Sequence, residues 1–232
     1  MKLKEKIFMY LWQGRANNCN SYIYKGEKTI LFDPGHIFND FDENCLEQLY
    51  KKMVEDGFKL EDLDYILCTH GHPDHVQSVG LLREQTGARF GIHQGDSFIL
   101  EALSKHYGSG SDIELPSLQP DFYLEEGLLD IGLSDNNSAD QIEVIHTPGH
   151  SPGCVCFHLP GEKALISGDT VFQGSVGRTD LPGGDTGTLG QSIEKLSGIE
   201  GIEFVLPGHM GYVKGAAMVM QNYDRIKRYF FG

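Results

Sequence analysis

Short apolar runs rich in β-branched and aromatic residues alternate along the chain with stretches of helical periodicity. Turn-forming residues bound the apolar runs, which predicts strands over residues 20–24, 29–32, 63–68, 88–93, 142–146, 155–159, 164–167 and 202–206. Apolar positions at helical spacing predict helices over residues 44–57, 75–86, 188–196 and 216–230. Residues 104–119, rich in Gly, Ser and Pro, are expected to form a surface loop. The irregular alternation favours a mixed sheet structure with outer helices.

Composition narrows the class of protein. With 232 residues, 40% of them apolar, the chain can bury a core as one large domain. Nineteen basic against 33 acidic residues give a formal charge of −14, which disfavours a nucleic-acid partner. Five cysteines, an odd number without Cys-x-x-Cys spacing, indicate neither a disulfide framework nor a thiolate zinc site. No apolar run or leader sequence indicates a membrane or an export route, so we expect a cytoplasmic protein.

Four predicted strands are each followed closely by a side chain that binds metals. In chain order these side chains are His70 and His72, then His150, Asp169 and His209. Ligands bind at the carboxyl ends of strands in open sheets with outer helices, so this placement predicts that the side chains meet at one edge.

The densest cluster is CTHGHPDHVQ, residues 68–77. Pro73 favours an extended His72, so His70 and His72, two positions apart, should point the same way. Asp74 is expected to be the N-cap of a helix that His75 opens, with Gln77 completing a capping box. This geometry presents two imidazoles on one side and an Asp–His pair on the other, which predicts two adjacent metal ions.

The candidate ligands suffice for two ions. His70, His72 and His150 are assigned to one ion, Asp74, His75 and His209 to the second, and Asp169 is expected to bridge them. Neutral imidazoles and carboxylates suit divalent zinc, iron or manganese, and we favour zinc. Three protein ligands plus a shared carboxylate leave room for water, which is typical of a catalytic site.

These motifs carry a resemblance to a known family. THGHPDH (69–75), PGHSPG (148–153), GDT (168–170) and PGH (207–209) resemble the metallo-β-lactamase fold superfamily over nearly the whole chain. The resemblance implies a single α+β domain over residues 1–232, an αβ/βα sandwich of two mixed β-sheets with helices on the outer faces. It also implies a dinuclear site on one edge.

Within this superfamily, residues 168–180 resemble the glyoxalase II branch, especially short members without a helical substrate domain. The Gly-Arg-Thr-Asp segment is also similar to persulfide dioxygenases. Phe172 stands where the family's quorum-signal lactonases typically have tyrosine, which counts against a lactonase. Only residues 210–232 follow the last ligand, and we expect a helix and a tail there rather than a substrate domain.

The leading hypothesis is a dinuclear metallohydrolase that cleaves a small-molecule thioester with a metal-bridging hydroxide as nucleophile. Asp74 is the candidate catalytic residue, because it is placed to orient the hydroxide or accept a proton. Arg178 is a candidate for binding a substrate carboxylate, although pairing with Asp180 within its own loop is favoured.

Three alternatives stay open. His70 or His72, together with His150 and Asp169, match a mononuclear iron site, so a persulfide dioxygenase-like oxidation is the second hypothesis. A lactone or other ester hydrolase is the third. A non-catalytic binding module ranks last, because every expected ligand is present. The expected partner is a small-molecule substrate, with neither nucleic acid nor membrane involved; the oligomeric state is left open.

Overall fold

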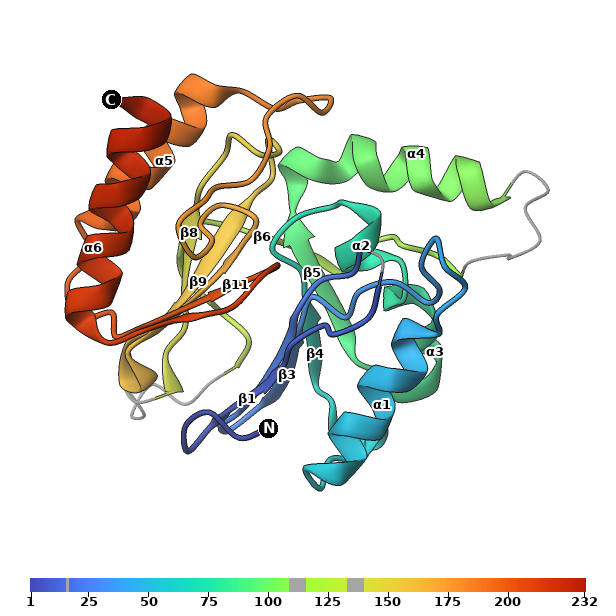
Figure 1. Ribbon diagram of the computed structural model, residues 1–232. Helices are drawn as coiled ribbons and strands as arrows, with labels where there is room; N and C mark the ends of the chain where they lie inside the picture. Colours follow the sequence, from blue (N-terminus) through green and yellow to red (C-terminus); the bar gives the residue numbers. More distant parts are fainter. Residues whose placement is uncertain (16, 109–115, 133–139) are drawn as a thin grey trace. The chain divides into compact units, whose positions relative to one another are not determined.

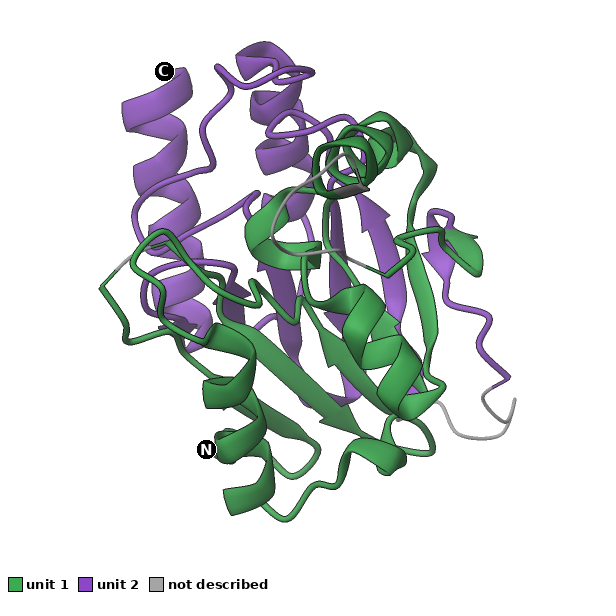
Figure 2. Cartoon of the chain, turned by 90° about the vertical axis from the view of Figure 1, so that its right-hand side faces the viewer, with its two compact units in different colours: residues 1–123 green, residues 124–232 purple. Residues whose placement is uncertain are grey.

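The computed structural model describes residues 1–15, 17–108, 116–132 and 140–232 (Figure 1). The chain divides into two compact units, Met1–Tyr123 and Leu124–Gly232 (Figure 2). Each unit builds its own sheet and its own apolar core, so each is described by itself.

The first unit carries a six-stranded sheet in the order β1-β2-β3-β4-β5-β6. Its strands are β1 (Ile7–Tyr10), β2 (Ser21–Lys25), β3 (Thr29–Phe32), β4 (Tyr65–Leu67), β5 (Arg89–His93) and β6 (Phe122–Leu124). The helices are α1 (Cys45–Glu55), α2 (Pro73–Val76), α3 (Val79–Thr86) and α4 (Ser97–Gly108), with 3-10 turns at Leu60–Asp62 and Gln94–Asp96. β2 runs antiparallel to both of its neighbours, β1 and β3, whereas β3, β4 and β5 run parallel.

The core of the first unit follows from the two-residue period of its strands. Side chains at alternate positions, such as Ile23, Leu31 and Ile66, pack with Met53 of α1 and Leu82 of α3 in one buried cluster. The helices therefore cover one face of this sheet, as Figure 1 shows for α1 and α3 beside β3 and β4.

The second unit carries a six-stranded sheet in the order β12-β11-β10-β9-β8-β7. Its strands are β7 (Gly127–Leu128), β8 (Glu143–His146), β9 (Val155–Leu159), β10 (Ala164–Gly168), β11 (Phe204–Pro207) and β12 (Val213–Lys214). α5 (Thr186–Ser197) and α6 (Ala216–Ile226) pack against it, with a 3-10 turn at Pro160–Glu162 and a π-helical end at Lys227–Phe231. Leu189 and Ile193 of α5 and Tyr223 of α6 share a cluster with Leu165 and Val205 of the sheet.

Strand direction brings the loops of interest to one edge in each unit. In the first unit the parallel strands β3, β4 and β5 end at the same edge. In the second unit β10 and β11 are parallel. β8 is antiparallel to β9, which is antiparallel to β10, so β8 also points the same way as β10. Residues that follow these strands are therefore neighbours within each unit.

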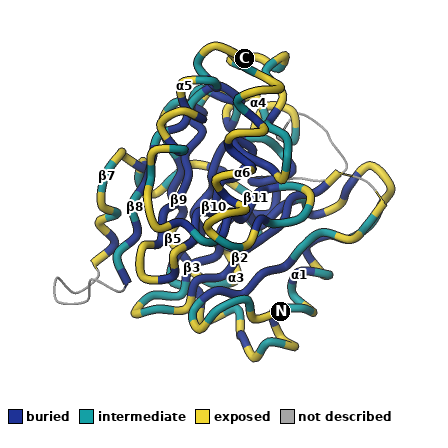
Figure 3. The backbone as a smooth tube through the Cα atoms, turned by 60° about the vertical axis from the view of Figure 1, so that its left-hand side comes forward, coloured by how far each residue is buried: buried dark blue, intermediate teal, exposed yellow. Residues whose placement is uncertain are grey.

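Both sheets are mixed and carry helices, which confirms the predicted α+β class. All eight predicted strands form, and their burial is visible along the tube in Figure 3. The helix predicted over 75–86 is two helices, α2 and α3, broken at residues 77 and 78. All five cysteines lie among the described residues and are buried, and none of them forms a disulfide. Among the described residues, none of the helices has the length and apolar character that a bilayer crossing requires.

The surface loop predicted over residues 104–119 is wrong for its first part, because α4 continues to Gly108. Leu100 at 4% exposure and the partly buried Leu103 pack on the core of the first unit, which keeps the polar residues that follow in the same helix. Residues 109–115 of that prediction lie outside the described residues.

Candidate metal centre

The first unit gathers four of the predicted metal ligands after β4. The ring centroids of His70 and His72 lie 4.8 Å apart, and those of His70 and His75 lie 4.0 Å apart. A carboxylate oxygen of Asp74 also lies within 4.8 Å of a ring nitrogen of His75. His70 and His75 are fully buried and Asp74 is 8% exposed. Imidazoles and a carboxylate gathered in one buried place form a donor set that fits a divalent cation.

Pro73 explains how this segment turns. His72 has φ −68° and ψ 150°, the extended geometry predicted for a residue before proline, and it is the N-cap of α2. Because proline is pre-organised for the first helical position, α2 begins at Pro73. The expectation that Asp74 is the N-cap and that His75 opens the helix is therefore wrong. Asp74 lies inside the first turn, so its carboxylate is not used as a cap.

Gln77 does not complete the expected capping box. Its Oε1 accepts the backbone amide of Ile37 at 2.9 Å, and its Nε2 donates to the Tyr107 hydroxyl at 2.6 Å. The side chain thus ties the end of α2 to the segment after β3 and to α4.

A buried carboxylate from the neighbouring strand orients two of the histidines. Asp33, which follows β3, accepts the Thr69 amide at 2.7 Å and the Thr69 hydroxyl at 2.8 Å. Since that hydroxyl proton goes to Asp33, the Thr69 oxygen, 3.1 Å from Nδ1 of His70, acts as acceptor for the His70 ring. Nδ1 of His75 lies 3.0 Å from Asp33 Oδ2. The His70 contact favours the tautomer that protonates Nδ1 and presents Nε2 as the metal-binding atom, while Asp33 places a buried negative charge beside the His75 ring.

Asp33 was not among the ligands or supporting residues predicted from the sequence. Its φ of 49° lies in the left-handed region, which Asp tolerates better than most residues. The left-handed turn after β3 is therefore reason enough for an aspartate at this position. The buried contacts of Asp33 show that it also supports residues 69–75, which we call the metal-type loop.

Asn17 is a second residue that sequence reasoning missed. Its exposed side chain donates from Nδ2 to Oδ2 of Asp74 at 2.7 Å. The hydrogen bond fixes one carboxylate oxygen of the candidate catalytic residue. Asn17 stands beside Asn18 and close to Asn20, and the sequence gives no signal that singles it out for this contact.

The second unit gathers the other three predicted ligands. Nε2 of His150 lies 3.6 Å from Oδ2 of Asp169, and Nε2 of His209 lies 3.3 Å from the same oxygen. Donors around a tetrahedral zinc ion, each about 2.0–2.1 Å from it, are separated by roughly 3.3 Å. One carboxylate between two imidazoles at these distances therefore fits metal coordination.

Main-chain geometry orients His150. Its Nδ1 lies 2.6 Å from the carbonyl oxygen of Arg178, which can only accept, so Nδ1 carries the proton and Nε2 faces Asp169. Gly177 makes this approach possible. A Cβ there would overlap the Asp169 carbonyl oxygen and stand 3.0 Å from Nδ1 of His150. Gly149, with φ 138°, is required in the same way, because a Cβ would overlap the backbone of Leu189.

The Arg178 side chain points to a different partner. Its Nε and Nη2 donate to both oxygens of Asp180 at 2.6 and 2.7 Å, and both side chains are exposed. The hydrogen bond from Arg178 lowers the pKa of Asp180 to about 2. A role of Arg178 in substrate binding stays a prediction.

Arg178→Ala is expected to leave metal content unchanged, because the acceptor for His150 is a backbone atom. The exposed ion pair between Arg178 and Asp180 contributes little to the stability of the loop. Its removal should therefore change the zinc dissociation constant by less than about 3-fold. Gly177→Ala, one residue earlier, is expected to lose metal, since the new methyl group displaces Asp169 or His150. Metal analysis of both variants checks this contrast. If KM rises tenfold in Arg178→Ala at full metal content, the arginine binds substrate instead.

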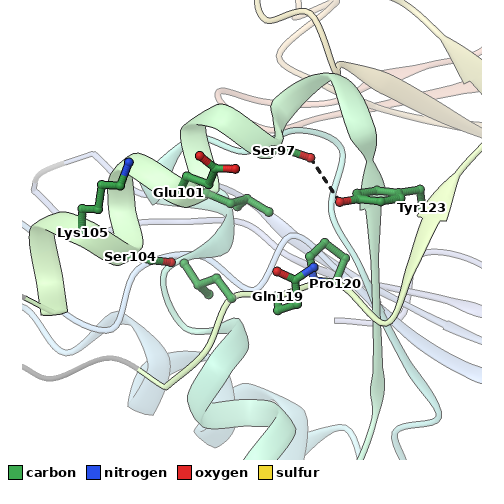
Figure 4. Close-up of a pocket in the computed structure, with 9 residues that line it drawn as sticks. Ser97, Glu101, Ser104, Lys105, Gln119, Pro120 and Tyr123 are labelled. Carbon is green, nitrogen blue, oxygen red and sulfur yellow. Dashed lines mark hydrogen bonds between the residues drawn. The ribbon is translucent and has the colours of Figure 1, made fainter.

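A cavity of about 410 Å³ opens elsewhere in the first unit (Figure 4). Ser97, Glu101, Ser104 and Lys105 of α4 line one side, and Gln119, Pro120 and Tyr123 line the other. The Ser97 hydroxyl donates to the Tyr123 hydroxyl at 3.4 Å. None of the predicted ligands lines this cavity, so we assign it no part in the metal chemistry.

The chain is similar to proteins of one superfamily. The model of the metallo-β-lactamase superfamily matches residues 14–209. Hydroxyacylglutathione hydrolase GloC of Haemophilus influenzae is 33% identical over 199 residues, 84% of this chain and 86% of the relative. The probable metallo-hydrolase YqgX of Bacillus subtilis is 32% identical over 195 residues, 82% of this chain and 84% of the relative.

Solved structures are also similar to this chain. The crystal structure of TTHA1623 in a di-iron-bound form is 32% identical, with a TM-score of 0.67, over 88% of this chain and 91% of that chain. A family match over most of the chain, relatives above 30% identity and two mixed sheets with metal-type donors at their strand ends support one conclusion. This chain belongs to the metallo-β-lactamase superfamily.

Proposed function

We propose that this member of a metallo-hydrolase family cleaves a thioester of a small thiol. The observation that carries the proposal is the position of Asp169, whose Oδ2 lies 3.6 and 3.3 Å from the Nε2 atoms of two imidazoles. A carboxylate shared in this way is the arrangement that a bridging ligand needs. The 33% identity to a hydroxyacylglutathione hydrolase supports the choice of a thioester.

The seven predicted ligands would hold two divalent cations. We propose His70, His72 and His150 for one cation, Asp74, His75 and His209 for the other, and Asp169 for both. When bound, such cations supply Lewis acidity toward a carbonyl oxygen and a water molecule of lowered pKa. Zinc suits the imidazole-rich set, and iron and manganese accept the same donors.

The chain's own residues would prepare the reaction. The Asn17 amide donates to Oδ2 of Asp74 and so fixes the carboxylate that would bind a cation and orient water or accept its proton. The Arg178 carbonyl would keep His150 in the tautomer that protonates Nδ1, so that Nε2 presents its lone pair, and the Asp33 carboxylate would hold the His75 ring in place. No serine or cysteine nucleophile is required by this scheme.

Metal analysis combined with a substrate panel tests the proposal. The protein is purified without chelator, its metals are quantified by mass spectrometry, and hydroxyacyl and simple acyl thioesters of glutathione and other small thiols are assayed. We expect about two ions per chain and thioester hydrolysis that chelation abolishes and zinc restores. Lactones and persulfides belong in the same panel.

Other outcomes of this experiment would assign a different function. One iron per chain and oxygen consumption with a persulfide would assign a persulfide dioxygenase-like oxidation instead. Hydrolysis of lactones or oxygen esters alone would keep the metallohydrolase and reject the thioester. Full metal content without turnover of any class would favour a binding module. A small-molecule substrate, the absence of a nucleic-acid or membrane partner, and the cytoplasmic location stay predictions.

A further inference from the structure

A second buried carboxylate contacts the loop that carries the histidines. Asp96 is fully buried, and its Oδ2 accepts the backbone amide of Gly71 at 2.7 Å. Gly71 is the residue between His70 and His72. Asp96 is not a predicted ligand, and it belongs to a different strand connection from Asp33.

The fold delivers Asp96 to this point by a short turn after β5. β5 is the parallel neighbour of β4, so both strands end at the same edge of the sheet. The 3-10 turn Gln94–Asp96 follows at once, and Nδ1 of His93 accepts the Gly95 amide at 3.1 Å as its cap. The turn reverses the chain before α4 begins and directs the Asp96 carboxylate towards the end of β4.

The contact is also close, so that a side chain larger than that of glycine would crowd it. A Cβ on Gly71 would stand 3.0 Å from Cβ of Asp96 and 3.4 Å from Cβ of Ile99. The loop therefore lies directly against the start of α4. A buried carboxylate costs free energy unless it is hydrogen-bonded, and a bond to a charged acceptor is about twice as strong as a neutral one.

We propose that Asp96 is a positioning residue for metal binding. By holding the Gly71 amide it fixes the peptide plane between His70 and His72, and with it the directions in which the two imidazoles leave the backbone. The two rings then stay at their interplanar angle of 87°. This inference rests on the proposed metal-binding role of His70 and His72, but not on the identity of the substrate.

Zinc affinity of three variants tests this role. Asp96→Ala removes the acceptor, and we expect its zinc dissociation constant to rise by about 10–100-fold, as for other partners outside the first coordination shell. Asp96→Asn keeps an oxygen that can accept the same amide, so its constant should stay within about 3-fold of wild type. Competition with a chromophoric chelator measures the constants, and the absorption spectrum of the cobalt-substituted protein reports ligand geometry.

Asp121→Ala is the matched control. Asp121 also accepts a backbone amide of the first unit, that of Phe90 at 2.7 Å, but it does not contact the metal-type loop. We expect Asp121→Ala to lower the unfolding midpoint of the apo protein without changing the zinc constant or the cobalt spectrum. A merely structural role of Asp96 would give the same result as this control.

Two results would overturn the proposal. One is wild-type zinc affinity and an unchanged cobalt spectrum in Asp96→Ala. The other is an equal loss in Asp96→Asn and Asp96→Ala, which would assign the effect to charge rather than to the hydrogen bond. If Asp96→Ala does not fold, Asp96→Ser, one bond shorter but still polar, takes its place. Because no substrate enters the assay, failure of every thioester would reject the proposed function and leave this result standing.

Discussion

Asp169→Ala is expected to remove metal and activity together. Asp169 Oδ2 is the one oxygen that lies near both His150 and His209, so its loss takes a donor from each proposed ion. We expect metal affinity and thioester hydrolysis each to fall by more than about 100-fold. Losing a residue that only supports a metal ligand costs up to about that factor, and losing a ligand itself should cost more. Metal content after dialysis and a thioester assay measure both quantities on the same preparation.

Asp180→Ala provides the control for this substitution. Asp180 lies on the loop that follows Asp169, but its carboxylate is exposed and pairs with Arg178. Its loss is expected to leave metal content and hydrolysis close to wild type. Full metal content in Asp169→Ala would count decisively against the assignment of Asp169 as a ligand.

Among these substitutions, Asp33→Ala is expected to cause the largest loss in the free energy of unfolding. The substitution removes the acceptor of the Thr69 amide and hydroxyl and the charge beside Nδ1 of His75, all in a fully buried place. Breaking a buried polar pair by removing one partner costs about 3–5 kcal/mol. Urea unfolding of the apo protein should show a loss of this size, and zinc affinity should fall as the two histidines lose their orientation.

Asp33→Asn separates the causes of that effect. Asn tolerates the left-handed backbone of this position and keeps one acceptor oxygen, but it lacks the charge that faces His75. We expect a smaller loss of stability and a clear loss of zinc affinity. Wild-type zinc affinity in both variants would show that Asp33 only holds the turn together.

The gathering of candidate ligands within each unit could be predicted from the sequence because their spacing has a local cause. Pro73 sets the extended geometry of His72, and the strand before it ends where polar residues begin, so two neighbouring imidazoles follow from local rules. The later candidate ligands also follow from local rules, because each stands just past a buried strand. They are His150, Asp169 and His209. Each of these inferences uses only a few consecutive residues.

The supporting residues could not be predicted, because they depend on which strands are neighbours. Asp33 contacts Thr69 only because β3 pairs with β4, and Asp96 reaches Gly71 only because β5 pairs with β4 on the other side. Sheet order is a tertiary fact that one sequence does not reveal. α4 was not predicted at all, for a similar reason: packing of Leu100 and Leu103 on the core stabilises a helix whose last residues, 104–108, the sequence pattern assigns to a loop.

The acceptor that orients His150 is a main-chain oxygen, and this has an evolutionary consequence. Any amino acid at position 178 supplies the same carbonyl, provided that Gly177 keeps the chain close. The ring orientation of His150 is therefore insulated from mutation at its own partner residue. Descendants of this chain are free to vary the side chain at 178 for other purposes, such as the choice of acyl group, without losing the histidine.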